Sequence, residues 1–535
     1  MSRAGEHSGP PIARTPSGSV RGVWEYASPG ADPNADAVGT DVAVFRGIPY
    51  AERPTGEHRY AAPRPRRPWE GVLEATRFGP TPMRGHVGMT LIPEESIAGD
   101  DILSVNVWTP TLDPDAALPV LVWIHGGGYL SGSPASPWYD GRAFARDGVV
   151  LVTLSYRLGF RGFGWTEGAV PNRGVLDWVC ALQWVQGHIA SFGGDPGRVT
   201  IGGQSAGGSA ALTLMGVPYA AGLFHGVCAM SPAIADASLI AAKDRGRRLA
   251  KLAAVAPDEA GFLSIPESRV LELQRRVASP AMPHLLHDLH ELLREGLMIG
   301  PVADGEVVLS DVETAASRGS SAGVPLVIGT ADDELTGLLQ PGGPLEHLPR
   351  RMLLRALGAS SQSAAHWLEH PRTGAFTSTA VMLGRYVTDV FFRSWVPRIA
   401  TAREQTPEAG PTWSYRFSWH GEKPPYAGHC IDIPFVFDRL DAPGVSAVAG
   451  PAPPQRLADA VHGAIVRFSR DGYPGWPRDT DGDGPSRIFD VPLRDEADAY
   501  ASARMVRPEE AAVAVAEPPV PEVGAAAEQP KLRAQ

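Results

Sequence analysis

The sequence has few cysteines and no excess of basic charge, and each lack excludes a class of protein. Cys180, Cys228 and Cys430 lie far apart, so they form neither a disulfide framework nor a zinc cluster. We expect them to be buried free thiols. With 48 Lys and Arg against 59 Asp and Glu, the net charge of −11 argues against nucleic acid and anionic membranes as partners.

Long apolar runs are also missing. No stretch approaches the roughly 18 apolar residues that a membrane-spanning helix needs. The first residues, MSRAGEHSGPPIARTP, contain no apolar segment of the kind that marks a signal peptide. We therefore expect a soluble, cytoplasmic protein without a membrane partner.

The middle of the chain has the composition of one large domain. A hydrophobic fraction of 43%, with 13 Trp, 12 Tyr and 16 Phe, suffices for an extensive core. Residues 1–14 are polar and rich in Pro, Gly and Ser, and residues 506–535 are rich in Ala, Pro and Glu. Neither end can bury enough apolar area to offset its ordering entropy, so we expect a disordered leader and a disordered tail around a domain of residues 15–505.

Short apolar runs alternate with helical patterns along this domain. The runs at 119–124, 148–154, 198–203 and 324–330 predict buried strands. Residues 174–193 have apolar side chains three and four positions apart and predict a helix that stops at Gly193. We expect an α/β fold with a mostly parallel central sheet, and helical insertions over the active site from about 235 to 320 and 340 to 400.

The stretch Gly203-Gln204-Ser205-Ala206-Gly207 has the form G-x-S-x-G between a strand pattern and a helix pattern. In that context the serine occupies a sharp turn that lifts its hydroxyl above the sheet. Side chains two residues before or after it would collide, which explains the glycines. We expect Ser205 to be a nucleophile; the alternative is an ordinary glycine-rich turn.

A nucleophilic serine needs a base, and the base needs an orienting acid. The acidic cluster Asp332-Asp333-Glu334 directly follows a predicted strand, and His429 lies further on in a glycine-flanked loop. This order, serine then acid then histidine, fits a triad built at the ends of strands. Cys430 has no oxyanion loop of its own, so we do not expect it to be a nucleophile.

Three glycines, Gly126 to Gly128, follow another predicted strand. Backbone N–H groups approach a tetrahedral oxyanion only where no Cβ intervenes. The run therefore suits an oxyanion hole, in which one donor is worth roughly 3–4 kcal/mol. A simple turn is the alternative.

Ordered motifs over most of the chain resemble the type-B carboxylesterases, the group that includes the cholinesterases, within the α/β-hydrolase fold. The resemblance implies a serine esterase with Ser205 as nucleophile, His429 as base and Glu334 as acid. It also implies Gly127, Gly128 and Ala206 as oxyanion donors, with no metal or organic cofactor. The matching segments are VFRGIPYAERPTGEHRY, GDDILSVNVWTP, HGGGYLSG, SYRLGFRGF, NRGVLDWVCALQWVQGHIASFGGDPGRVTIGGQSAGGSA, PVADG, GHCIDIPFVFD and FSRDGYPGWP.

Three positions depart from the family pattern. Leu335 replaces the glycine that usually follows the acid, so Asp333 stays an alternative to Glu334. Gln204 stands where the family often has Glu, which removes a negative charge beside the nucleophile. Ile102 stands where many relatives have a disulfide cysteine, so a cholinesterase-type choline site is not expected.

The sequence therefore predicts hydrolysis of a small-molecule carboxylic ester through an acyl-enzyme. The same residues could act on a lactone, amide or thioester, or transfer the acyl group, because the pocket sets the leaving group. An inactive binding protein of the same family is a further alternative, although such members lack the serine. The oligomeric state and the physiological substrate are not indicated.

Overall fold

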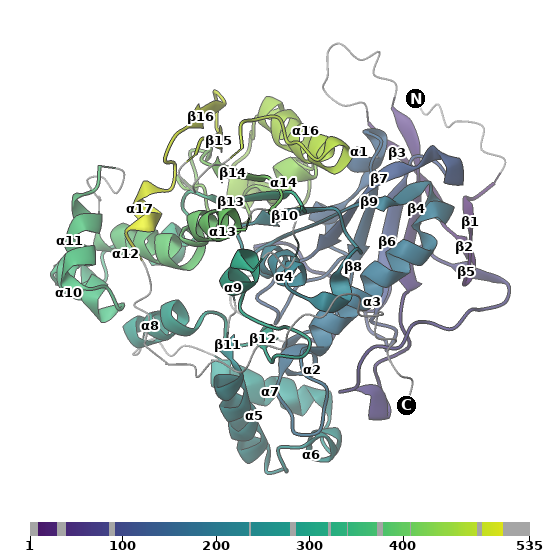
Figure 1. Ribbon diagram of the computed structural model, residues 1–535, viewed down its shortest axis with the longest axis horizontal. Coiled ribbons are helices and arrows are strands. Elements are labelled where there is room, and N and C mark those ends of the chain that lie inside the picture. Colours follow the sequence, from purple (N-terminus) through teal and green to yellow (C-terminus); the bar gives the residue numbers. More distant parts are fainter. Residues whose placement is uncertain are drawn as a thin grey trace.

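A mostly parallel sheet of eleven strands organises the part of the chain that the computed structural model describes (Figure 1). That part comprises residues 9–28, 39–84, 91–234, 237–278, 285–318, 321, 323–339, 341–371, 378–406, 408–478 and 484–506. In spatial order the strands are β16 (Arg494–Glu496), β15 (Ser486–Phe489), β14 (Thr412–Phe417), β13 (Leu326–Ala331), β10 (Gly226–Met230), β9 (Gly194–Gln204), β7 (Leu118–Ile124), β8 (Val150–Leu154), β6 (Ser104–Thr109), β4 (Thr40–Pro49) and β3 (Val23–Ala27).

The strands from β8 through β7, β9, β10, β13 and β14 to β15 pair in parallel. Antiparallel pairs close both edges of the sheet. Parallel strands place their carboxyl ends at one edge, and ligands of open α/β sheets bind outside that edge. The glycine run follows β7, Ser205 follows β9, the acidic cluster follows β13, and His429 lies in the loop after β14. The topology alone therefore brings these segments to one edge.

Both faces of the sheet are covered, which explains the continuous apolar runs. Along β7, Val120 and Val122 join one core cluster and Leu121 and Trp123 join another, because successive strand side chains point to opposite faces. The first cluster also contains residues of α3 (Arg173–His188) and α4 (Ala206–Met215). The second contains residues of α1 (Arg142–Arg146), α14 (Ile433–Val436) and α16 (Gln455–Asp471).

The helix expected over 174–193 is confirmed as α3 followed by a 3-10 turn that ends at Gly193. Two helical groups extend from the sheet, as expected for insertions. In Figure 1, α5 to α7 lie at the lower edge and α10 to α12 at the left. The remaining helices are α2 (Gly159–Phe163), α5 (Leu239–Ala253), α6 (Glu259–Leu263), α7 (Glu267–Ala278), α8 (Leu285–Glu295), α9 (Val312–Ser317), α10 (Arg350–Ala356), α11 (Ser361–Glu369), α12 (Thr379–Thr388), α13 (Trp395–Glu404), α15 (Val445–Ala449) and α17 (Ala501–Arg504).

The expected limit of the leader at residue 14 is wrong. Strand β1 (Ile12–Thr15) pairs with β2 (Gly18–Arg21), which also pairs with β5 (Val72–Glu74). Ala13 is buried in the core, so this short segment does find apolar contacts. The earlier part of the leader, residues 1–8, and all of the tail after Val506 lie outside the described residues. A two-stranded sheet, β11 (Ala237–Ser238) with β12 (Val302–Ala303), completes the strands seen in the described part.

None of the described helices is both long enough and apolar enough to cross a lipid bilayer.

A fully buried ion pair connects the loop after β8 to helix α3. Arg157 donates through Nε and Nη2 to the carboxylate of Asp177, at 2.8 and 2.7 Å, and its backbone N–H donates to the same carboxylate at 3.0 Å. Both side chains are 0% exposed. Removing one partner of such a pair leaves an uncompensated buried charge.

We expect Asp177→Ala to lower the free energy of unfolding by about 3–5 kcal/mol, because the guanidinium of Arg157 then stays buried without its carboxylate. Urea denaturation followed by tryptophan fluorescence measures the change. Glu369→Ala is the control, since the ion pair of Glu369 with Arg351 is largely exposed. This variant should unfold at the same urea concentration as the wild type. Equal losses in the two variants would contradict the assignment.

Candidate active site

The turn at Ser205 is strained in the way that its motif predicts. Ser205 has φ +60° and ψ −125°, and helix α4 begins at the next residue. A Cβ on Gly207 would lie 2.0 Å from the carbonyl oxygen of Ile124, and one on Gly203 would lie 2.5 Å from the backbone of Gly207. The glycines therefore allow the turn to pack against the end of β7.

His429 and Glu334 meet beside this turn. The Nδ1 atom of His429 lies 2.5 Å from Oε2 of Glu334, and the backbone N–H of His429 donates to the carbonyl of Glu334 at 3.1 Å. The other carboxylate oxygen accepts from the backbone N–H of Ala331 at 2.8 Å. The Glu334 side chain is 0% exposed, so its orientation toward the imidazole is fixed by burial and by these bonds.

The other two acids of the cluster have different partners. Asp332 forms a bidentate pair with Arg416, with both distances at 2.7 Å. Asp333 pairs with Arg385 and accepts from the hydroxyl of Thr336. Of the three carboxylates, that of Glu334 contacts His429.

The glycine run lies directly against the serine turn. A Cβ on Gly126 would lie 2.7 Å from the carbonyl oxygen of Gln204 and 3.2 Å from Cβ of Ser205. Gly127 has φ +112°, a conformation that favours glycine, and its carbonyl accepts from the N–H groups of Leu130 and Ser131. On the other side of Ser205, the first N–H groups of α4 have no acceptor within the helix. The serine therefore lies between the glycine loop and the start of α4.

Comparison with known proteins identifies the family of this chain. A model of the carboxylesterase family matches residues 9–480. The chain belongs to the carboxylesterase family. The expected enzyme class, a carboxylic ester hydrolase, and the resemblance found in the motifs are confirmed by this membership.

Curated relatives of this carboxylesterase match over most of their length. A para-nitrobenzyl esterase of Bacillus subtilis (strain 168) is 33% identical over 86% of this chain and 94% of its own. A fumonisin B1 esterase of Sphingopyxis macrogoltabida is 31% identical over 83% of this chain and 82% of its own. A liver carboxylesterase of Sus scrofa is 30% identical over 89% and 88% of the two chains.

Solved structures confirm the α/β-hydrolase fold. A carboxylesterase of Geobacillus stearothermophilus superposes with a TM-score of 0.77 at 30% identity, covering 92% of this chain and 99% of its own. A PNB esterase superposes with a TM-score of 0.75 at 29% identity, covering 92% and 98%.

An aromatic ring and two polar groups enclose the imidazole of this carboxylesterase. A π-helical segment (Asp389–Arg393) presents Phe392, whose ring centroid lies 4.9 Å from that of His429. Burial disfavours the charged imidazolium, but the neighbouring Cys430 and Glu334 outweigh it and raise the pKa of His429 well above its ordinary value. These neighbours therefore stabilise the imidazolium form of the ring.

A buried acid that the sequence does not reveal, Asp432, lies three residues after His429. Burial, together with the nearby charge of Glu334, raises the pKa of Asp432 to about 7. The hydroxyl of Tyr415 lies 3.4 Å from one carboxyl oxygen, and the other oxygen has no hydrogen-bond partner among the described residues. Its spacing from His429 was the only signal in the sequence, because nothing there shows that the side chain is buried.

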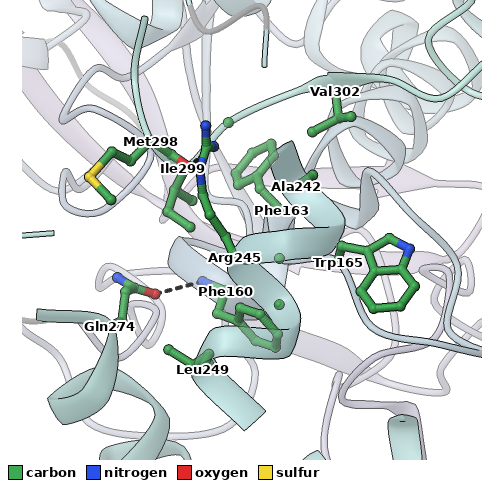
Figure 2. Close-up of a pocket in the computed structure, with 13 residues that line it drawn as sticks. Phe160, Phe163, Trp165, Ala242, Arg245, Leu249, Gln274, Met298, Ile299 and Val302 are labelled. Carbon is green, nitrogen blue, oxygen red and sulfur yellow. Dashed lines mark hydrogen bonds between the residues drawn. The ribbon is translucent and has the colours of Figure 1, made fainter. Parts of the chain in front are cut away.

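An apolar pocket adjoins the glycine loop through helix α2 (Figure 2). Gly159 of this helix donates to the carbonyl of Tyr129 at 2.7 Å, and the ring of Phe163 lies 4.9 Å from that of Tyr129. Gln274 brings a polar group to the wall, where its Oε1 accepts from Phe160 N–H at 2.7 Å. Ser205, Glu334 and His429 do not line the pocket. Its apolar lining includes Phe160, Phe163, Trp165, Leu249, Met298 and Ile299.

We expect Gly207→Ala to lower the free energy of unfolding by about 1–3 kcal/mol, because the new methyl group overlaps the carbonyl of Ile124. Ester hydrolysis should fall as well, since relief of the overlap moves the serine turn. Thermal unfolding and initial rates measure the two effects. In the control Gly187→Ala, the exposed helical site has nothing within 4 Å, and a gain of about 0.5–1 kcal/mol is expected. A neutral Gly207→Ala would contradict the close packing.

We expect Asp432 to make stability depend on pH. The unfolded carboxyl loses its proton near pH 3.9 and the folded one near pH 7, so between these values the folded state holds more protons. The free energy of unfolding therefore falls as pH rises, by up to about 4 kcal/mol from this group. Urea denaturation at pH 5 and pH 7.5 measures the fall. Asp432→Asn cannot ionise and should show a smaller fall than the wild type; an identical pH dependence would contradict the assignment.

Proposed function

We propose that this carboxylesterase cleaves its ester through an acyl-enzyme on Ser205. His429 accepts the Ser205 hydroxyl proton at Nε2 as the oxygen attacks the ester carbonyl, and returns it to the departing alkoxide. Water then attacks the acyl-enzyme with the same base, which releases the carboxylic acid and restores the serine. Glu334 holds Nδ1 of the imidazole and stabilises its cationic form.

The N–H groups of Gly127, Gly128 and Ala206 are the proposed oxyanion donors. Their support is the position of the glycine loop against the turn and the start of α4 directly after Ser205. Donors fixed in place before the reaction stabilise the tetrahedral intermediate without reorganisation. The observation that carries the whole proposal is the 2.5 Å contact of His429 with buried Glu334 beside a strained serine.

The same machinery suits lactones, amides, thioesters or acyl transfer to a second alcohol. Membership of the carboxylesterase family favours an ester as substrate, and an alkoxide needs less protonation than an amine to leave. A panel that varies the acyl part and the leaving group independently, with amides and lactones included, decides between them. Product ratios in the presence of an added alcohol report transfer.

We expect Ser205→Ala to lower kcat on short-chain p-nitrophenyl esters by at least about a thousandfold, because no nucleophile remains. Glu334→Gln should lower kcat by a similar order, since a neutral amide neither selects the tautomer nor stabilises the imidazolium. Burst and steady-state release of p-nitrophenol measure both.

Asp333→Asn is the matched control for the acid, because Asp333 is the adjacent carboxylate and pairs with Arg385 instead. Its turnover should stay within a few-fold of the wild type. Wild-type turnover in Ser205→Ala would refute the nucleophile. A larger loss in Asp333→Asn than in Glu334→Gln would reassign the acid.

A further inference from the structure

Gln204, the residue before the nucleophile, contacts the imidazole. Its side chain is 0% exposed, and its Nε2 lies 3.4 Å from Nδ1 and 3.4 Å from Nε2 of His429. One atom at equal distance from both ring nitrogens cannot lie along the in-plane direction of either. The amide therefore lies against the face of the ring, and the in-plane directions stay available to Glu334 and to Ser205.

The thiol of Cys430 fixes which end of that amide faces the ring. Its Sγ lies 3.4 Å from Oε1 of Gln204 and donates to it. Since the oxygen accepts from the thiol, the NH₂ group is directed to the imidazole. Cys430 has φ +69°, a conformation that a glycine would adopt more easily, and it is only 6% exposed. A buried thiol in a strained position therefore has a defined partner.

We propose that Gln204 and Cys430 are a pair of positioning residues for His429, a role that rests on the proposed function of His429 as base. Cys430 orients the Gln204 amide, and the amide holds one face of the imidazole while Phe392 contacts the ring as well. The amide of Gln204 is neutral, so it contacts the ring without adding a second carboxylate to that of Glu334. The titratable groups that act on His429 are then Glu334, Cys430 and Asp432.

Gln204→Ala tests the contact between the amide and the ring of His429. Gln204→Glu tests whether the side chain at position 204 must be uncharged. We expect Gln204→Ala to lower kcat about tenfold with little change in KM, because a misplaced base costs rate and not ground-state binding. Gln204→Glu retains the volume and adds a charge against the ring. It should move the acid limb of the kcat/KM pH profile upward by about one unit, because a nearby negative charge favours the protonated imidazole.

Cys430 is tested by a double-mutant cycle. Cys430→Ala should lower the pH-independent kcat about threefold, and the double variant with Gln204→Ala should be no slower than Gln204→Ala alone, because the thiol acts on the position of the ring through the amide. The direct effect of Cys430 on the pKa of His429 shifts the pH profile instead. Cys430→Ser keeps a donor and should restore the wild-type rate.

The chain offers a control for each substitution. Gln186→Glu introduces the same change at a half-buried glutamine that donates to the carbonyl groups of Pro196 and Leu223, and Cys180→Ala removes a buried thiol near Tyr50. Both should leave the pH profile and kcat in place. Thermal unfolding of every variant shows whether it folds. If Gln204→Ala does not fold, the pH profile of Gln204→Glu and the rates of the Cys430 variants test the proposal.

An unchanged pH profile in Gln204→Glu, or losses in Gln204→Ala and Cys430→Ala that multiply in the double variant, would overturn the proposal. Failure of the triad itself is distinguished by Ser205→Ala. If Ser205→Ala is inactive while all Gln204 and Cys430 variants match the wild type, the triad stands and the positioning pair does not.

Discussion

The approach of the Gly207 backbone to the end of β7 is the contact on which the rest of the site depends. It brings the end of β7, the serine turn and the first turn of α4 so close together that no Cβ fits at Gly203 or Gly207. The strain at Ser205 persists because β9 and α4 are both packed into the core on either side of it. Every other group of the site is then positioned by strands parallel to β9.

Much of the fold could be predicted from the apolar runs and the helical periodicity of the sequence. The buried strands appear as continuous apolar runs because both faces of the sheet are covered, and α3 shows its period because one face packs on the sheet. The limit of the leader was wrong because β1 is only four residues long and its polar neighbours mask a single buried side chain, Ala13. Strand pairing over such a short range leaves no periodicity to detect.

The turn at Ser205 and the place of the glycine run could be predicted from the sequence, because a G-x-S-x-G turn requires small residues at fixed positions. Sequence order did not single out Glu334 as the neighbour of His429, because Asp332, Asp333 and Glu334 all follow the same strand. Their arginine partners separate them, and Arg385 and Arg416 are distant in the chain. Asp432 was missed because the sequence does not show that its side chain is buried. The amide of Gln204 was missed because it contacts His429 across 225 residues of the chain.

The places at which the two helical groups join the sheet affect how a protein of this fold can diverge in evolution. One group of helices connects β10 to β13 and the other connects β13 to β14, so each leaves the sheet and returns to it at adjacent strands. The entropy of closing a loop grows only with the logarithm of its length. Helices can therefore be added, lost or reshaped between Ser205 and Glu334, or between Glu334 and His429, while the strands keep these residues in place. The outer helices can diversify in sequence and length while the arrangement at the edge of the sheet stays constant.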